Sequence, residues 1–228
     1  MRYRWPKAHR SAAVLSFDFD AESGFLFREP EKATRSLADL EERRFGPRVG
    51  VDRILRLLDR LELKATFFIP GWTVENHLAE SKRIRDAGHE IGAHGNVHEA
   101  VGMLDEAQEK EVMRRQLAIL KDLLGVKPAG SLIEVPVQWI MDDAPLFRHV
   151  YGATNAIADP ARVYQMWSAE FAAMHKENGC FVLTCHPFVS GRASRIQLIE
   201  DLVRFMRKQK GVWFTTCEAV ARWHEKAR

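Results

Sequence analysis

Residues 14–20, Val-Leu-Ser-Phe-Asp-Phe-Asp, form an apolar run that ends in two carboxylates. The β-branched, apolar start of this run predicts a buried strand over residues 14–19. Side chains along a strand alternate between its two faces, so Ser16, Asp18 and Asp20 would share one face. Neighbouring carboxylates repel each other, and one of them is hard to ionise unless a cation lies beside the pair. This stretch therefore predicts a strand that presents paired carboxylates at its end.

A second segment, residues 92–99 (Gly-Ala-His-Gly-Asn-Val-His-Glu), offers two histidines with three residues between them. His94 and His98 would lie on one face if this segment makes a helical turn. Neutral imidazole is the commonest metal-binding side chain. Two imidazoles and one carboxylate form a three-ligand site that leaves positions open for water and substrate. The two segments therefore favour a catalytic metal site over the alternative, in which these side chains cap surface turns.

The rest of the chain alternates between strand and helix patterns. Further strands are predicted over residues 65–69, 89–93, 131–137, 180–185 and 211–215, and helices over residues 33–44, 51–63, 74–87, 105–124, 159–178, 194–209 and 217–226. Such alternation implies parallel strands with helices outside them. Asp20, His94 and His186 would then follow the C-terminal ends of strands, where barrels of parallel strands carry their active sites.

Composition sets limits on the class of protein. The 228 residues, 46% hydrophobic and 29% charged, predict one folded domain over residues 1–228 and exclude a disordered protein. The net charge of +3 gives no reason to expect a nucleic-acid partner. The apolar stretch 12–17 is too short for a signal peptide or a membrane span, so we expect a cytoplasmic protein without a membrane partner. Three cysteines lack metal-site spacing and are expected to be reduced: Cys180, Cys185 and Cys217.

The motifs resemble those of the NodB-homology family, the polysaccharide deacetylases. Residues 18–20, Asp-Phe-Asp, are similar to the first motif of that family, and residues 94–98, His-Gly-Asn-Val-His, to its second. Residues 183–187, Leu-Thr-Cys-His-Pro, resemble the strand that ends in the family's late catalytic histidine. Residues 65–72 are similar to the family's second strand.

The resemblance covers most of the chain, from Trp5 to about Trp223. Residues 132–139, followed by Asp142 and Asp143, are typical of one branch of the family. That branch holds cytoplasmic peptidoglycan-deacetylase-like proteins, cyclic-imide hydrolases and allantoinase-type enzymes. It also implies a homo-oligomer, which nothing in the composition can test.

The resemblance implies an α/β fold, a distorted (β/α) barrel with fewer than eight parallel strands, and a set of roles. Asp20, His94 and His98 would hold a divalent ion, expected to be Zn²⁺, which lowers the pKa of bound water to about 7. Asp18 would take a proton from that water as general base. His186 would protonate the leaving nitrogen or stabilise the tetrahedral oxyanion.

Six further residues are expected near this site: Trp72, Trp139, Asp143, Pro187, Glu22 and Glu99. The first four are candidates for binding substrate. The two glutamates are candidates to accept the second ring N–H of a ligating histidine, because such imidazoles usually donate to an acceptor. The alternatives are core packing for the tryptophans, turn capping for the aspartate and solvated loop positions for the glutamates.

The chain departs from the family pattern after the long helix. A motif containing proline and tryptophan normally follows there, but residues 125–130 run directly into residues 131–134. A βαβ unit takes about 30 residues or more, so one or two βα units are expected to be missing after residue 130. Such a loss would remove part of the barrel and a wall of the substrate pocket.

Three functions remain open. The first is N-deacetylation of an N-acetylated sugar or a related small amide. The second is ring opening of a cyclic imide or ureide, which uses the same metal chemistry. The third is a non-catalytic homologue whose incomplete barrel serves assembly or ligand binding. An Fe(II) oxygenase, which also uses two histidines and a carboxylate, is disfavoured because those enzymes usually have antiparallel double-sheet folds.

Overall fold

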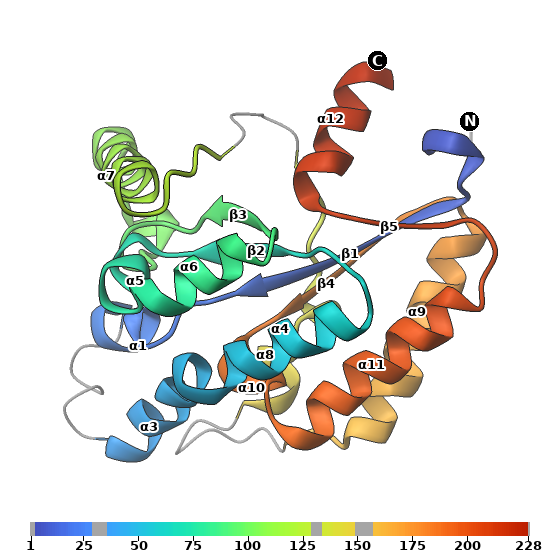
Figure 1. Ribbon diagram of the computed structural model, residues 1–228, viewed down its shortest axis with the longest axis horizontal. Coiled ribbons are helices and arrows are strands. Elements are labelled where there is room, and N and C mark those ends of the chain that lie inside the picture. The colour runs from blue at the N-terminus through green and yellow to red at the C-terminus, as the bar shows by residue number, and fades with distance from the viewer. Residues whose placement is uncertain (1–2, 29–35, 129–133, 149–156, 228) are drawn as a thin grey trace.

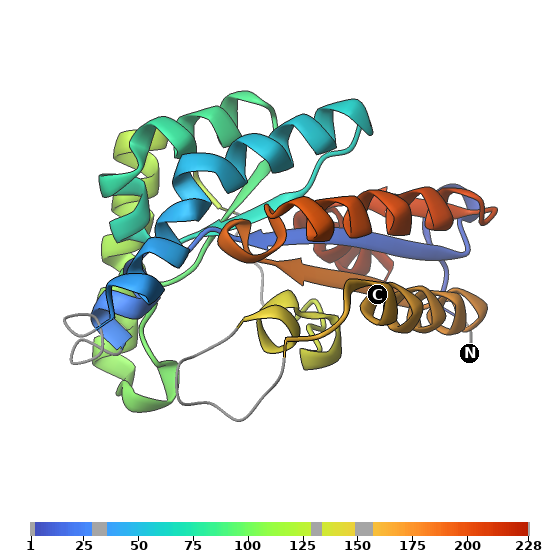
Figure 2. The same cartoon turned by 90° about the horizontal axis from the view of Figure 1, so that it is seen from below.

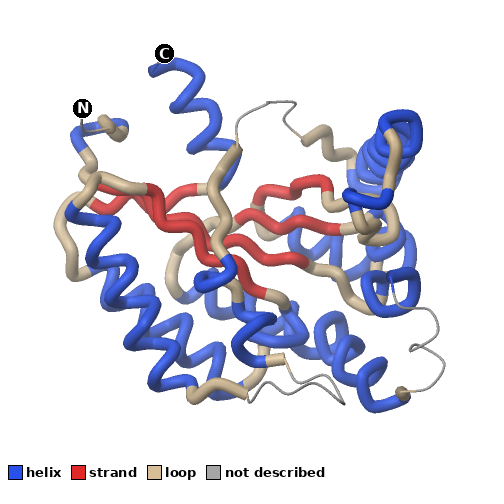
Figure 3. Tube along the Cα trace, turned by 180° about the vertical axis from the view of Figure 1, so that it is seen from behind, coloured by secondary structure: helices blue, strands red, loops and turns tan. Residues whose placement is uncertain are grey.

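The computed structural model describes residues 3–28, 36–128, 134–148 and 157–227. Five strands form one parallel sheet in the middle of the molecule, with helices around it (Figures 1 and 3). The strands are β1 Ser11–Asp18, β2 Thr66–Ile69, β3 Glu90–Ala93, β4 Cys180–Cys185 and β5 Val212–Thr215. The predicted α/β class with parallel strands is therefore confirmed.

The central strand is β1. On one side, residues 12–17 pair with β4. On the other, residues 11–14 pair with β5 and residues 16–18 pair with β2, so these two strands share one edge. Strand β3 continues the sheet beyond β2. Because β1 is covered on both faces, its residues form the continuous apolar run that is typical of buried parallel strands.

The helices cover both faces of the sheet. They are α1 Ser23–Arg28, α3 Leu37–Phe45, α4 Val51–Arg60, α5 Gly71–Asn76, α6 Leu78–Asp86, α7 Glu106–Leu124, α8 Asp143–Phe147, α9 Pro160–Lys176, α10 Pro187–Ser190, α11 Ala193–Arg207 and α12 Cys217–Ala227, with short turns at Pro6–Ala8, Gly46–Gly50, Val101–Met103 and Trp139–Met141. Helices α4, α9 and α11 pack together against one face of β1 and β4, and α12 contributes to the apolar cluster on the other face; Figure 2 shows α11 beside β1 and α9 beside β4. Among the helices of the described residues, none combines the length and apolar character needed to cross a membrane.

Most predicted elements are confirmed within a few residues at their ends, but two predictions are wrong. Residues 134–137 form no strand, and residues 131–133 of that prediction lie outside the described part. The helix predicted over residues 74–87 is two helices that meet at His77, whose ring donates to Glu22 at 2.7 Å. Residues 94–98 form an irregular loop, so the condition of a helical turn for His94 and His98 is not met.

The sheet is open between β3 and β4. These two strands end the path β3-β2-β1-β4, and they also flank residue 130 in the sequence. Within the described residues between them, strand-like pairing is limited to an isolated parallel bridge of Asp142 with Thr184 on β4. An incomplete barrel with its opening at this place agrees with βα units missing after residue 130.

A close backbone approach holds α10, which follows His186, against the turn before α4. A Cβ atom built on Gly50 would lie 2.1 Å from the carbonyl oxygen of Pro187. We expect Gly50→Ala to lower the free energy of unfolding by about 2 kcal/mol or more, because the backbone must shift to make room. Urea denaturation measures this, with Gly102→Ala as control, since Gly102 has nothing within 4 Å of its added Cβ. Equal stability of the two variants would contradict this packing.

Candidate active site

A cavity of ≈ 980 Å³ lies at the C-terminal ends of the strands. Asp18 and Asp20 reach it from the end of β1, and His94 and His98 from the loop after β3. His186 reaches it from the end of β4. Parallel strands thus bring together five side chains that are far apart in the sequence, all at the edge where the sequence predicts a site.

Asp20 and the two histidines form a group whose ligand-type atoms all lie within 4.8 Å of one another. His94 Nε2 is 3.4 Å from Asp20 Oδ1, and His98 Nε2 is 3.7 Å from Asp20 Oδ2. Asp20 Oδ1 and His94 Nε2 are buried and have no hydrogen-bond partner in the described protein. Buried polar atoms without partners call for an explanation, and a cation held between them supplies one. This donor set fits a divalent metal ion.

The backbone around Asp20 is fixed from two directions. Its carbonyl oxygen accepts hydrogen bonds from the Thr73 hydroxyl at 2.7 Å and the Ser23 hydroxyl at 2.8 Å. Burial alone would disfavour its charge, yet the histidines around the carboxylate hold the pKa of Asp20 well below its usual range. Asp20 is therefore a preformed anionic ligand.

Asp18 behaves in the opposite way. Burial raises the pKa of its carboxyl group, and the charges of His94 and His186 offset this only in part. Its Oδ2 atom lies 3.6 Å from His94 Nε2, beside the metal-type group but outside it. The paired carboxylates thus differ as their sequence predicts: one ionises easily and the other resists.

Residues 94–99 form the loop that carries both histidines, and hydrogen bonds to its backbone hold it in place. Gly95 and His98 both adopt positive φ angles, of 71° and 62°. Glu99 accepts hydrogen bonds from the backbone N–H groups of Asn96 and Val97, at 2.9 and 3.1 Å. The backbone N–H of Trp72 donates to the Asn96 carbonyl at 2.7 Å and ties the loop to α5. Glu99 therefore shapes the loop and does not accept from a ligating imidazole.

Glu22 is also engaged elsewhere. Its two carboxylate oxygens contact His77 Nε2 at 2.7 Å and Arg44 Nε at 3.4 Å. The expectation that Glu22 and Glu99 support the ligating histidines directly is thus not met by their contacts. Both instead fix segments that carry the ligands, Glu22 by joining the start of α1 to the break between α5 and α6.

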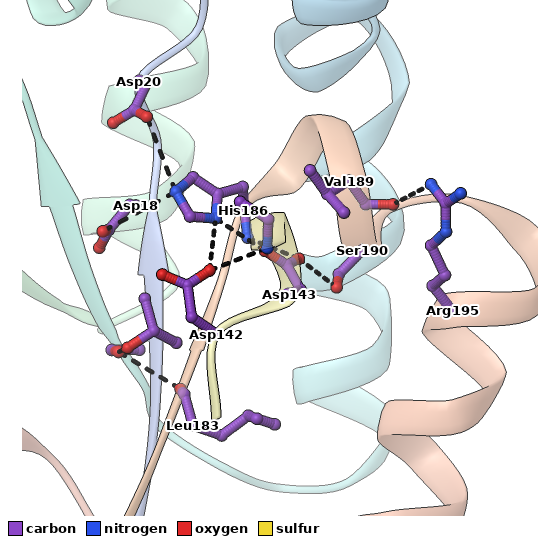
Figure 4. Close-up of polar contacts among 12 residues, drawn as sticks. Asp18, Asp20, Asp142, Asp143, Leu183, His186, Val189, Ser190 and Arg195 are labelled. Atoms are coloured by element: carbon purple, nitrogen blue, oxygen red, sulfur yellow. Dashed lines mark hydrogen bonds and ion pairs between the residues drawn. The ribbon is translucent and has the colours of Figure 1, made fainter. Parts of the chain in front are cut away.

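His186 is oriented by Asp143 (Figure 4). Its ring Nδ1–H donates to Asp143 Oδ1 at 2.7 Å, and its backbone N–H donates to Asp143 Oδ2 at 2.9 Å. The Ser190 hydroxyl also donates to Asp143 Oδ2. The other ring nitrogen, Nε2, faces Asp20 Oδ2 at 3.8 Å and Asp18 Oδ2 at 4.0 Å. The ring is thereby aimed at the paired carboxylates.

Charge accumulates around this imidazole. Burial by itself disfavours the imidazolium, but the carboxylates of Asp143, Asp20 and Asp18 raise the pKa of His186 to about 10. Burial raises the pKa of Asp142, which lies 3.7 Å from His186 Nδ1, to about 6. Asp142, Asp143 and His186 also have ligand-type atoms near one another. The direct hydrogen bond between Asp143 and His186 satisfies both groups, so this cluster needs no ion.

The four candidate substrate residues, all of them described, are placed differently. Trp139 is 80% exposed and lines the cavity. Asp143 is completely buried behind His186, so it cannot touch substrate. The Trp72 ring packs against Phe27 at 5.7 Å between centroids and does not line the cavity. Pro187 is buried at the start of α10 and does not line it either.

Sequence reasoning missed one prominent cavity residue. Arg43 lines the cavity and is only 6% exposed. It stands in the charged stretch Glu-Glu-Arg-Arg of residues 41–44, which is typical of a solvated helix face and carries no signal of burial.

The chain is similar in sequence to known proteins. The family model for polysaccharide deacetylase matches residues 45–156. The peptidoglycan deacetylase of Helicobacter pylori is 25% identical over 278 aligned positions, which cover 90% of this chain and 92% of that protein. Because this alignment is longer than the 228 residues here, the relative has stretches without a counterpart in this chain.

Two solved structures share the fold. One assigned to the polysaccharide deacetylases, from Mycobacterium smegmatis, is 30% identical, with a TM-score of 0.92 over 99% of this chain and 93% of that one. The structure of PuuE allantoinase has a TM-score of 0.82 over 97% of this chain and 92% of that one. At 18% identity it shows a common fold alone.

Proposed function

We propose that this chain, which belongs to the polysaccharide deacetylase family, is a metal-dependent hydrolase that removes an acetyl group from an N-acetylated sugar or a related amide. The observation that carries the proposal is the convergence of Asp20, His94 and His98. Two of their buried ligand atoms lack hydrogen-bond partners, and a second carboxylate, Asp18, and an oriented histidine, His186, lie beside them.

The types of ligand indicate which metal ion to expect. Two imidazoles and one carboxylate with open positions are typical of catalytic zinc, so we expect Zn²⁺. When bound by Asp20, His94 and His98, such an ion polarises the amide carbonyl and makes water more acidic.

The chain's own residues move the protons. Asp18 is placed to accept the proton of the attacking water, and its resistance to ionisation would be relieved by a cation beside it. His186 Nε2 faces both carboxylates, at 3.8 and 4.0 Å, and is placed to donate a proton to the leaving nitrogen. Asp143 keeps this ring oriented and protonated from behind. One carboxylate would thus serve as base and one imidazolium as acid.

The test is acetate release by the zinc-loaded protein from N-acetylglucosamine oligomers. We expect release that stops with a chelator and returns with Zn²⁺. Hydrolysis of a cyclic imide or of allantoin in place of these oligomers would favour the ring-opening alternative. No hydrolysis of either class by metal-loaded protein would favour a non-catalytic homologue.

The Asp143–His186 pair leads to a prediction about pH. Removing the Asp143 carboxylate lowers the pKa of His186, so the acid is lost at a lower pH. We expect Asp143→Asn to lower kcat about 100-fold and to move the descending alkaline limb of the kcat/KM profile to lower pH. Ser190→Ala, which removes one hydrogen bond to Asp143, should move the limb much less. An unmoved limb in Asp143→Asn would mean that His186 is not the acid.

Trp139 gives a prediction about binding. Because its ring is 80% exposed at the cavity, Trp139→Ala should leave the free energy of unfolding within about 0.5 kcal/mol. We expect it to raise KM about three- to tenfold through loss of aromatic contact with substrate. Trp72→Ala is the control, since the Trp72 ring lies outside the cavity and KM should stay unchanged. Equal KM values for both variants would remove Trp139 from the substrate site.

A further inference from the structure

The cavity contains a cationic group that the proposed chemistry does not use. Arg43, in the last turn of α3, lines the cavity although it is only 6% exposed. Arg148, which follows α8, lines the same cavity. Burying a guanidinium is costly unless it meets anions, acceptors or an aromatic face, and Arg43 meets the face of the Phe188 ring.

The neighbours of Arg43 place it beside the metal-type group. Its guanidinium carbon lies 4.5 Å from the centroid of Phe188, whose ring is 5.7 Å from that of His186. On the other side, Arg43 Nη1 is 3.9 Å from the position of a Cβ on Gly24, and the same position is 3.5 Å from the His98 ring. Phe188 therefore lies between the guanidinium and His186, and Gly24 lies between the guanidinium and His98.

The cationic neighbours of Arg43 face outward. Arg44 pairs with Glu41 at 2.7 Å and with Glu22, and Arg48 pairs with Glu41 at 2.7 Å. Arg43 instead turns inward to the Phe188 face. Arg43 makes further contacts within the protein. A guanidinium has five N–H donors in a planar fork, so it can make such contacts and still donate to a ligand at its edge.

The carboxylates of the cavity gather around the ring of His186. Asp18, Asp20 and Asp142 all lie within 4.0 Å of a His186 ring nitrogen. The cavity thus holds the acidic, metal-type group and, on the wall formed by Phe188, the guanidinium of Arg43. A substrate whose amide reaches the metal-type group would present its neighbouring substituent to that wall.

We propose that Arg43 binds a carboxylate of the substrate, so that the site selects N-acetylated compounds bearing an acid group close to the amide. This inference rests on the proposed hydrolase function and specifies its substrate class. The planar fork of arginine matches a carboxylate with two parallel hydrogen bonds. Arg43 is only 6% exposed, and a pairing with a buried guanidinium is screened less by water than one at the surface.

The test uses a matched pair of compounds, N-acetylmuramic acid and N-acetylglucosamine, which carry the same acetamido group and differ in a carboxylate-bearing ether. We expect the zinc-loaded protein to have the higher kcat/KM for the acidic compound. Arg43→Gln should lower that kcat/KM about 10- to 100-fold and change the value for the neutral compound less than threefold. Arg43→Lys should retain part of the preference, since it keeps the charge and loses the fork.

Controls separate this inference from folding and from the proposed function. Arg48→Gln removes a nearby exposed cation and should leave the preference unchanged. Equal losses for both compounds in Arg43→Gln, or no preference in the unaltered protein, would overturn the inference. Calorimetric binding of the two compounds to the zinc-loaded Asp18→Asn variant reads the preference without catalysis. Binding preference for the acid without any acetate release would sustain the Arg43 assignment while the hydrolase proposal fails.

Discussion

Replacing Asp20 with asparagine is expected to abolish stoichiometric metal binding and to lower hydrolysis at least about 10³-fold. Asp20 supplies the anionic ligand between two imidazoles, and its low pKa shows that this environment favours the charged form. An uncharged amide at this position leaves two neutral ligands for a divalent ion, too few for a three-ligand catalytic site. Elemental analysis after dialysis against Zn²⁺ measures the ion directly.

A stability measurement checks the same prediction. A ligand that binds the folded state alone adds about 2.7 kcal/mol of stability at one hundred times its Kd. Added Zn²⁺ should therefore raise the Tm of the unaltered protein and leave that of Asp20→Asn unchanged. His224→Ala is the control, because His224 contacts Tyr3 and neither residue lines the cavity. If Asp20→Asn keeps one tightly bound ion per chain, the assignment of ligands is wrong.

The second large effect is expected for Asp18→Asn, which should retain the ion and lose about 10³-fold in kcat. A general base contributes roughly 10²- to 10⁴-fold, and asparagine cannot accept the proton. The variant should also be more stable than the unaltered protein when both are free of metal at pH 7. Burial raises the pKa of Asp18 in the folded state, so ionising it above the unfolded pKa costs stability, and a neutral isostere removes that cost.

The pH dependence of the stability gain in Asp18→Asn can be measured. The stability difference between Asp18→Asn and the unaltered protein should shrink as the pH falls below the unfolded pKa, where the carboxyl is neutral in both states. Thermal unfolding of metal-free samples between about pH 3 and about pH 7 measures this stability difference. A variant that retains kcat within tenfold would place the base elsewhere.

Several parts of the fold could be predicted from local pattern. Strand β1 is buried on both faces, so its apolar run is visible without any neighbour, and α7 begins with an Asp105 capping box and ends at Gly125. The strand predicted over residues 131–137 was wrong for its described part. Residues 134–137 have strand-like composition, but a strand needs a partner, and among the described residues the pairing near this segment is limited to the bridge of Asp142 with Thr184.

The break at His77 shows a second limit. Residues 74–87 have a continuous helical pattern, but the contact of His77 with Glu22, 55 positions away, coincides with the interruption. Local pattern contains no information about such a contact. For the same reason local pattern does not predict the conformation of residues 94–98, which depends on Glu99 and on backbone contacts with α5.

The sequence by itself determined the parallel α/β class and the set of ligand-type residues, because strand alternation and short motif spacing are local properties. The tertiary structure alone decided how those residues work together. It placed Asp143 behind His186, turned Glu22 and Glu99 toward backbone and cationic partners, and buried Arg43 in the cavity wall. These roles arise from contacts between segments up to 145 positions apart, Arg43 on α3 with Phe188 on α10, and such contacts depend on how the helices pack around the sheet.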